Sequence, residues 1–115
     1  MKISESKSGD VVVLSFSGEL MGGESAEEFQ KYVYRMIEND SVNIVLDMSE
    51  VEWMNSAGLG MIMGALTTFR GSGGDLRLAS VSERVARPIA VTRLDSVIQI
   101  YNSVDEAVKS FDEEE

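Results

Sequence analysis

A short segment in the middle of the chain brings together residue types that could support chemistry. It begins at Asp47, at the end of an apolar run, and continues through Ser56 to Gly60. Apolar residues at helical spacing follow Ser56, so we place this serine at the N-cap of a helix. A hydroxyl at the start of a helix, on the loop after a parallel strand, is exposed and electropositive. Such a position suits an anion, and it suits a serine that is phosphorylated.

The composition narrows what Ser56 can do. The chain has no His and no Cys, which removes the usual metal sites and the Ser–His and Cys–His nucleophile pairs. A lysine base is conceivable, but every lysine falls in a predicted surface element: Lys2, Lys7, Lys31 and Lys109. We therefore expect no enzymatic activity, no metal and no cofactor. Ser56 is either a helix cap with no further role or a phosphorylation site.

Three further residues of the segment are candidates for supporting Ser56. Gly58 and Gly60 are too few and too close together for a dinucleotide or phosphate-binding fingerprint. Two glycines in one helical turn instead indicate a close approach to the backbone, by a neighbouring element or by an outside partner. Asp47 ends the buried strand and should lie close to the Ser56 loop. We expect it to accept hydrogen bonds from loop amides, and the alternative is a place beside an incoming phosphate.

Large apolar residues lie in the same predicted loops. Met suits surfaces that must adapt their packing, so we assign Met21 and Met54 to a contact surface and Trp53 to the core. The predicted partner-binding set consists of seven residues: Met21, Met54, Asn55, Ser56, Ala57, Gly58 and Gly60.

The overall charge limits the partners. The formal net charge is -10, which argues against nucleic acid and anionic membranes. A basic protein partner is compatible with it, and so is a solvated acidic surface without a partner. The chain has no long apolar run and no signal-peptide pattern. We expect a cytoplasmic protein that is a monomer when free.

The element order predicts one domain over residues 1–115, with a frayed acidic tail at 112–115. Residues 1–7 and 11–16 should form a hairpin, and Val42–Asp47 should be a central strand covered on both faces. Further strands are expected at 76–79 and 97–101. Helices should begin at Ser25, Ser56, Ser82 and Ser103, the first and last with capping boxes, and Val91 could face inward. We expect an α/β fold with a mixed sheet of four to five strands, flanked by about four helices.

Residues 46–60, Leu-Asp-Met-Ser-Glu-Val-Glu-Trp-Met-Asn-Ser-Ala-Gly-Leu-Gly, resemble the signature of the STAS domain of bacterial anti-sigma factor antagonists. Gly18-Glu19-Leu20 also resembles the family's loop before its first helix. The resemblance implies that a partner serine kinase of the histidine-kinase-like ATPase type phosphorylates Ser56. That kinase doubles as the anti-sigma factor, binds the unphosphorylated antagonist and so frees the sigma factor. A PP2C-type phosphatase resets the switch.

The chain departs from the family pattern at two positions. The family often has Asp before the serine, where this chain has Asn55, and Asp after Gly-Glu-Leu, where it has Met21. Three alternatives stay open: a STAS module with an output other than a sigma factor, a small-molecule or nucleotide-binding module using the helix start at Ser56, and a subunit of a larger signalling scaffold.

Overall fold

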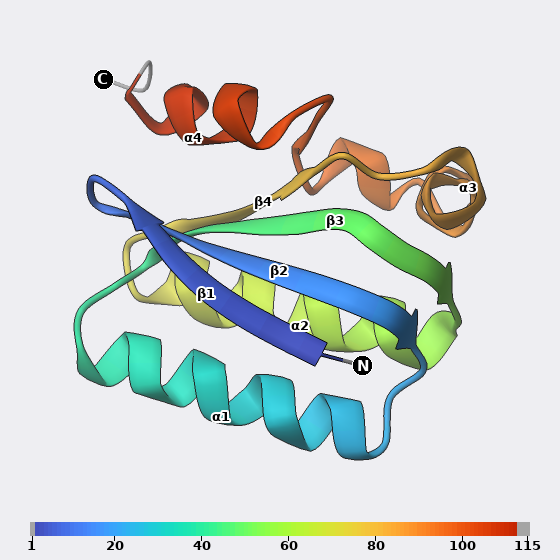
Figure 1. Cartoon of the computed structure of the whole chain (residues 1–115), viewed down its shortest axis with the longest axis horizontal. Helices are drawn as coiled ribbons and strands as arrows, with labels where there is room; N and C mark the ends of the chain where they lie inside the picture. The colour runs from blue at the N-terminus through green and yellow to red at the C-terminus, as the bar shows by residue number, and fades with distance from the viewer. Residues whose placement is uncertain (1, 113–115) are drawn as a thin grey trace.

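The computed structural model describes residues 2–112 and contains a mixed sheet with helices on both faces (Figure 1). The strand order is β1-β2-β3-β4-β5, with β1 antiparallel to β2 and the remaining neighbours parallel. The strands are β1 (Lys2–Ser8), β2 (Val11–Leu20), β3 (Asn43–Met54), β4 (Asp75–Ala79) and β5 (Ile100–Tyr101). The helices are α1 (Glu24–Glu38), α2 (Ser56–Gly71), α3 (Glu83–Val91) and α4 (Val104–Asp112), with a 3-10 turn at Leu94–Ser96. This arrangement confirms the predicted fold class, including the edge hairpin and the central place of β3.

The alternation of side chains along β2 explains the layers. Val12, Leu14 and Phe16 pack with α1 and α2 in the larger core cluster. Val11 and Val13 point to the other face and belong to a smaller cluster with α4. Figure 1 shows α1 and α2 on one side of the sheet and α4 on the other. Because both faces of the parallel strands are covered, these strands read as continuous apolar runs.

β2 and β3 are longer than the sequence predicts. Residues 18–20 and 48–54 were expected in loops, but they continue the parallel pair, with Gly18 opposite Val51 and Leu20 opposite Met54. Two register shifts interrupt this pairing. A bulge breaks the two-residue alternation that identifies a strand, so the sequence pattern hides the extension. β4 reaches only as far as Asp47 on β3, and α3 lies beside the far end of β3 (Figure 1).

Of the four predicted serine caps, those at Ser82 and Ser103 are confirmed, the one at Ser25 is wrong, and Ser56 is described with the site below. The hydroxyl of Ser82 accepts from the backbone N–H of Val85, and that of Ser103 accepts from Glu106. Ser25 instead lies inside α1, which begins at Glu24 without a side-chain cap. The cause is the preceding turn, where Gly22 and Gly23 both have positive φ and bring the chain into the helix earlier.

The C-terminal part also differs in detail from the prediction. Only Ile100–Tyr101 pairs as a strand, because residues 94–96 form a 3-10 turn. Val91 is 76% exposed and does not face inward. The predicted tail at 112–115 falls almost entirely outside the described residues.

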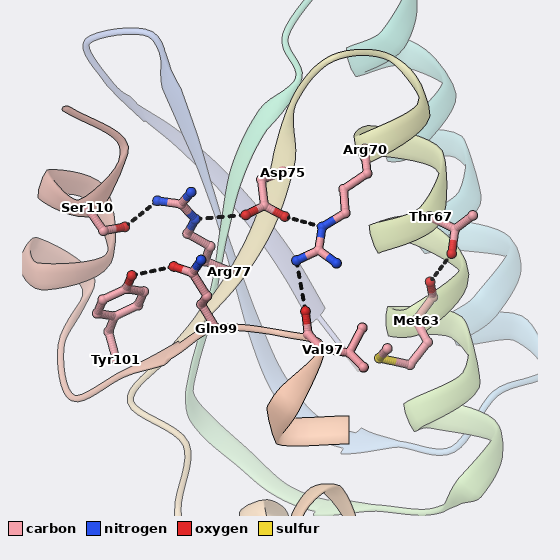
Figure 2. A network of polar contacts seen from close by, with 9 residues as sticks. All are labelled: Met63, Thr67, Arg70, Asp75, Arg77, Val97, Gln99, Tyr101 and Ser110. Atoms are coloured by element: carbon pink, nitrogen blue, oxygen red, sulfur yellow. Dashed lines mark hydrogen bonds and ion pairs between the residues drawn. The ribbon is translucent and has the colours of Figure 1, made fainter. Parts of the chain in front are cut away.

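A polar network links the two helix layers through the start of β4 (Figure 2). The carboxylate of Asp75 accepts from Arg70 of α2 at 2.8 Å and from Arg77 at 2.9 Å. The Arg77 side chain is 1% exposed, donates to the Ser110 hydroxyl of α4 at 2.7 Å and lies 3.9 Å from the Phe111 ring centroid. The network therefore fixes α2 and α4 to opposite sides of β4.

Replacing Asp75 with alanine is expected to lower the free energy of unfolding by about 2 kcal/mol, because two charged donors lose a common acceptor and Arg77 stays buried. Asp95→Ala is the control, since Asp95 is exposed and makes no ion pair with any residue in 2–112. Urea denaturation of both variants measures the difference. Equal stabilities would show that Asp75 is not part of the structural network.

Candidate functional site

Asn55, and not Ser56, caps α2. The side-chain Oδ1 of Asn55 accepts from the backbone N–H of Gly58 at 2.8 Å, and Asn55 has an extended backbone. Ser56 is the first residue of the helix. The prediction that Ser56 is the N-cap is therefore wrong by one position. Both residue types are good caps, so the choice between neighbours depends on where the strand ends.

The Ser56 side chain is exposed to solvent. Its hydroxyl makes no hydrogen bond within residues 2–112, unlike the hydroxyls of Ser82 and Ser103, which cap their helices. The first turn of α2 contains no acidic residue, so no carboxylate of that turn offsets the positive end of the helix dipole. The position combines an accessible hydroxyl with an environment that favours negative charge.

The turn between β2 and α1 lies against the start of α2. The backbone N–H of Asn55 donates to the carbonyl of Leu20 at 3.2 Å, and its side-chain Nδ2 donates to the carbonyl of Met21 at 3.4 Å. Gly22 approaches Ala57 so closely that a Cβ on Gly22 would lie 2.9 Å from the Ala57 Cβ. Met21 is 43% exposed. Met21, Ser56 and Ala57 therefore belong to one surface, which we call the Ser56 surface.

This geometry gives Asn55 a role that an aspartate at the same position cannot fill. An aspartate would keep the cap to Gly58 but has no N–H to donate to Met21. The amide therefore caps α2 and contacts the neighbouring turn at the same time.

The two glycines behind Ser56 have different environments. Gly58 is buried, and a Cβ placed on it would lie 2.0 Å from the carbonyl oxygen of Leu20. A neighbouring element therefore explains Gly58, which the sequence also assigned to partner binding. Gly60 is exposed, and within the described part of the chain a Cβ there would meet no atom within 4 Å other than those of its chain neighbours and of the α2 backbone. Gly60 remains available to an outside partner.

The predictions for Trp53 and Met54 are both wrong: Trp53 was assigned to the core and Met54 to the contact surface, and the structure shows the reverse. Met54 is 3% exposed and packs in the main core, whereas Trp53 is 44% exposed. The register shift between Gly18 and Glu19 of the paired strand accompanies this reversal. Met54 therefore leaves the predicted contact surface, and Trp53 joins the exposed apolar residues.

Asp47 lies far from Ser56. Its carboxylate accepts from the backbone N–H of Ser49 at 3.1 Å and from the Ser15 hydroxyl at 3.3 Å. β3 continues for seven residues beyond Asp47, which at about 3.3 Å per residue corresponds to roughly 20 Å. The expectation that Asp47 supports the Ser56 loop is wrong, because the supposed loop is strand. Asp47 instead joins adjacent residues of the sheet.

Two properties of residues 2–112 concern metals and membranes. No group of three or more His, Cys, Asp or Glu side chains is arranged to hold a metal ion in this part of the chain. Among its helices, none has the length and apolar character needed to cross a bilayer.

Replacing Asn55 with alanine is expected to destabilise the fold by about 1 kcal/mol, because the cap to Gly58 is lost. Ser56→Ala is the matched control at the next position and should change stability by less than about 0.5 kcal/mol. Chemical denaturation of both variants tests this order. A larger loss for Ser56→Ala would mean that the serine, and not Asn55, caps α2 in solution.

Comparison with known proteins agrees with the fold. The family model for the STAS domain matches residues 2–107. The chain therefore belongs to the STAS domain family, and its relatives include proteins named as anti-sigma factor antagonists.

A Thermotoga maritima protein, named as a candidate anti-sigma factor antagonist, is 38% identical over 101 residues, covering 87% of this chain and 88% of that protein. A crystal structure of a candidate anti-sigma factor antagonist from Thermotoga maritima superposes with a TM-score of 0.86 at 33% identity, covering 94% and 92% of the two chains. The anti-sigma-B factor antagonist of Listeria monocytogenes is 34% identical over 63 residues, covering 55% of each chain.

The antagonist SpoIIAA shares the fold at lower identity. Its unphosphorylated form has a TM-score of 0.73 at 14% identity, with 99% and 100% of the chains covered. The phosphorylated form of the Bacillus protein has a TM-score of 0.75 at 17% identity, with 96% and 99% covered.

Proposed function

We propose that the unphosphorylated protein binds a partner serine kinase that also acts as an anti-sigma factor, and that phosphorylation of Ser56 blocks this binding. The observation that carries the proposal is the exposed, unbonded hydroxyl of Ser56 beside a helix that Asn55 already caps. A serine that is not needed as a cap is free to be modified. The relatives named as anti-sigma factor antagonists support this assignment.

The physical basis of the switch is charge at an interface. A phosphoryl group adds about -1.5 to -2 charges at neutral pH. The start of α2 tolerates this charge, because its free N–H groups and dipole favour anions. A partner covering the Ser56 surface would have to desolvate the charged group. Phosphorylation should therefore weaken binding while leaving the fold unchanged.

The contact area follows from the same geometry. Met21, Ala57 and Gly60 are exposed around Ser56 and are the residues that we assign to the partner interface. The kinase is expected to be of the histidine-kinase-like ATPase type, and a PP2C-type phosphatase is expected to remove the phosphoryl group. In this proposal the protein is a cytoplasmic regulator, has no enzymatic activity of its own and is a monomer when free.

The test is phosphorylation by a histidine-kinase-like ATPase from the same genome. The wild-type protein is incubated with each such kinase and ATP, and intact mass and peptide mapping locate the product. We expect one phosphoryl group on Ser56 and none on Ser56→Ala. Ser82 and Ser103 are internal controls, because their hydroxyls are engaged as caps. A phosphoryl group on another residue, or no product with any of these kinases, would contradict the proposal.

Isothermal titration calorimetry with nucleotides distinguishes the proposed phosphorylation switch from a nucleotide-binding module. We expect ATP and GTP to give no binding signal with the isolated protein. Saturable nucleotide binding that is lost in Ser56→Asp would favour a nucleotide module using the start of α2.

A further inference from the structure

A shallow groove lies between the end of β3 and α3. Its β3 residues come just before Ser56 in the sequence. It is lined by Trp53 and Met54 from β3 and by Glu83, Arg84, Arg87, Pro88 and Val91 from α3. We call it the Trp53 groove. Its volume is about 560 Å³, whereas one water molecule occupies about 30 Å³. The groove therefore has room for apolar side chains of a partner.

The groove exists because β4 is shorter than β3. β4 pairs with β3 only from Asn43 to Asp47, so no strand formed by residues 2–112 lies on that side of β3 at Trp53. α3 lies there instead and turns Val85 and Ile89 into the core. Its outward face carries Arg84, Arg87, Pro88 and Val91, a spacing that places them on one side of a helix.

The apolar part of the groove is open to solvent. Trp53 is 44% exposed and Val91 is 76% exposed, and both are among the few large apolar side chains that the described residues leave at the surface. Pro88 also belongs to the lining and is half-buried. Exposed apolar side chains gathered in one groove are typical of an interaction site.

The charge of the groove is opposite to that of the whole chain. Arg84 and Arg87 are exposed, and neither has a carboxylate within 4 Å among residues 2–112. Among the described residues, Glu83 is the one acidic residue of the lining. The chain as a whole carries a formal charge of -10. Two unpaired arginines beside a tryptophan are therefore a local basic site on an acidic protein.

We propose that the Trp53 groove docks an acidic amphipathic helix of a protein partner. The apolar face of that helix contacts Trp53, Pro88 and Val91. Its carboxylates accept hydrogen bonds from the guanidinium groups of Arg84 and Arg87. Hydrogen bonds between a guanidinium group and a carboxylate are short and charge-assisted. An amphipathic helix can present apolar and acidic side chains together along one groove. This site is distinct from the phosphorylation switch, because none of its contacts involves Ser56.

The test uses Trp53 as the reporter, since it is the only tryptophan in the chain. Two stapled helical peptides without aromatic residues are titrated at physiological salt: both have leucine along one face, with glutamate or lysine on the other. We expect only the glutamate peptide to shift the Trp53 emission to shorter wavelength in a saturable way. Non-specific attraction to a protein of charge -10 would instead make the lysine peptide bind more strongly than the glutamate peptide. The two peptides therefore distinguish binding in the groove from non-specific attraction.

Matched variants locate the binding to the groove. The double variant Arg84→Gln and Arg87→Gln should weaken binding of the glutamate peptide by at least about tenfold, while Lys31→Gln, on the exposed surface of α1, should leave it unchanged. Ser56→Asp should bind the peptide as the wild type does, so this result does not depend on the proposed function. Equal or stronger binding of the lysine peptide, no saturable shift, or wild-type affinity of the double variant would overturn the proposal. A larger shift with a single-stranded oligonucleotide would assign the arginines to nucleic acid instead.

Discussion

Replacing Gly58 with alanine is expected to lower the free energy of unfolding by about 3 kcal/mol, a large part of the stability of a small domain. The added Cβ would lie 2.0 Å from the carbonyl oxygen of Leu20 and 2.8 Å from the carbonyl carbon. Both are backbone atoms of β2, which is paired to β3 and cannot move alone. The start of α2 would have to move away from β2, with loss of the Asn55 contacts. Urea denaturation measures the effect.

Gly60→Ala is the matched control for this change, two residues further along the same helix. Beyond its chain neighbours and the helix's own backbone, no atom of residues 2–112 lies within 4 Å of a Cβ placed there, and alanine is favoured over glycine in a helix. Its stability should rise by about 0.5–1 kcal/mol. If Gly58→Ala proved as stable as Gly60→Ala, the close approach of α2 to Leu20 would be absent in solution.

Ser56→Ala and Ser56→Asp are expected to have similar stabilities and very different affinities for the partner kinase. Alanine leaves the Asn55 cap intact, and aspartate places a negative charge at the favourable end of the helix dipole. In the unphosphorylated complex, Ser56→Ala should bind as the wild type does and should never be switched off. Ser56→Asp should bind at least about tenfold more weakly, because its carboxylate is buried against the partner.

The affinity measurement uses the kinase that modifies Ser56, with the phosphorylated wild-type protein as the reference for the blocked state. The aspartate variant should lie between the unphosphorylated and phosphorylated proteins, since it carries about one charge and phosphoserine carries about -1.5 to -2. Equal affinities for both variants would mean that charge at position 56 does not control the complex. Circular dichroism of each sample shows whether any loss of affinity reflects unfolding.

Much of the fold could be predicted from the sequence, because local patterns determined it. Phe29, Val33 and Met36 repeat at helical spacing, and they are buried along α1. The apolar run before Asp47 indicated a strand covered on both faces, and β3 is central. The caps at Ser82 and Ser103 could be predicted because each is a local contact. In each, the serine hydroxyl accepts from the backbone N–H three residues later.

The details of the site depended on contacts between segments distant in the sequence. Asn55 and Ser56 are both suitable caps, and only the end of the β3 pairing with β2 decides that Asn55 takes this role. The same pairing, with its register shifts, accompanies the exposure of Trp53 and the burial of Met54. It also turns the expected loop after Asp47 into strand, which moves Asp47 away from Ser56.

Gly58 and Gly60 show most directly what could not be predicted from the sequence alone. They are the same residue type in the same helical turn, and no local pattern distinguishes them. Only the carbonyl of Leu20, 38 positions earlier in the chain, makes one of them indispensable to packing and leaves the other at the surface. The sequence by itself determined the helices, the central strand and the candidate serine, because these follow from neighbours along the chain. The tertiary structure decided which neighbouring side chains face the solvent, because that depends on how β2, β3 and α2 meet.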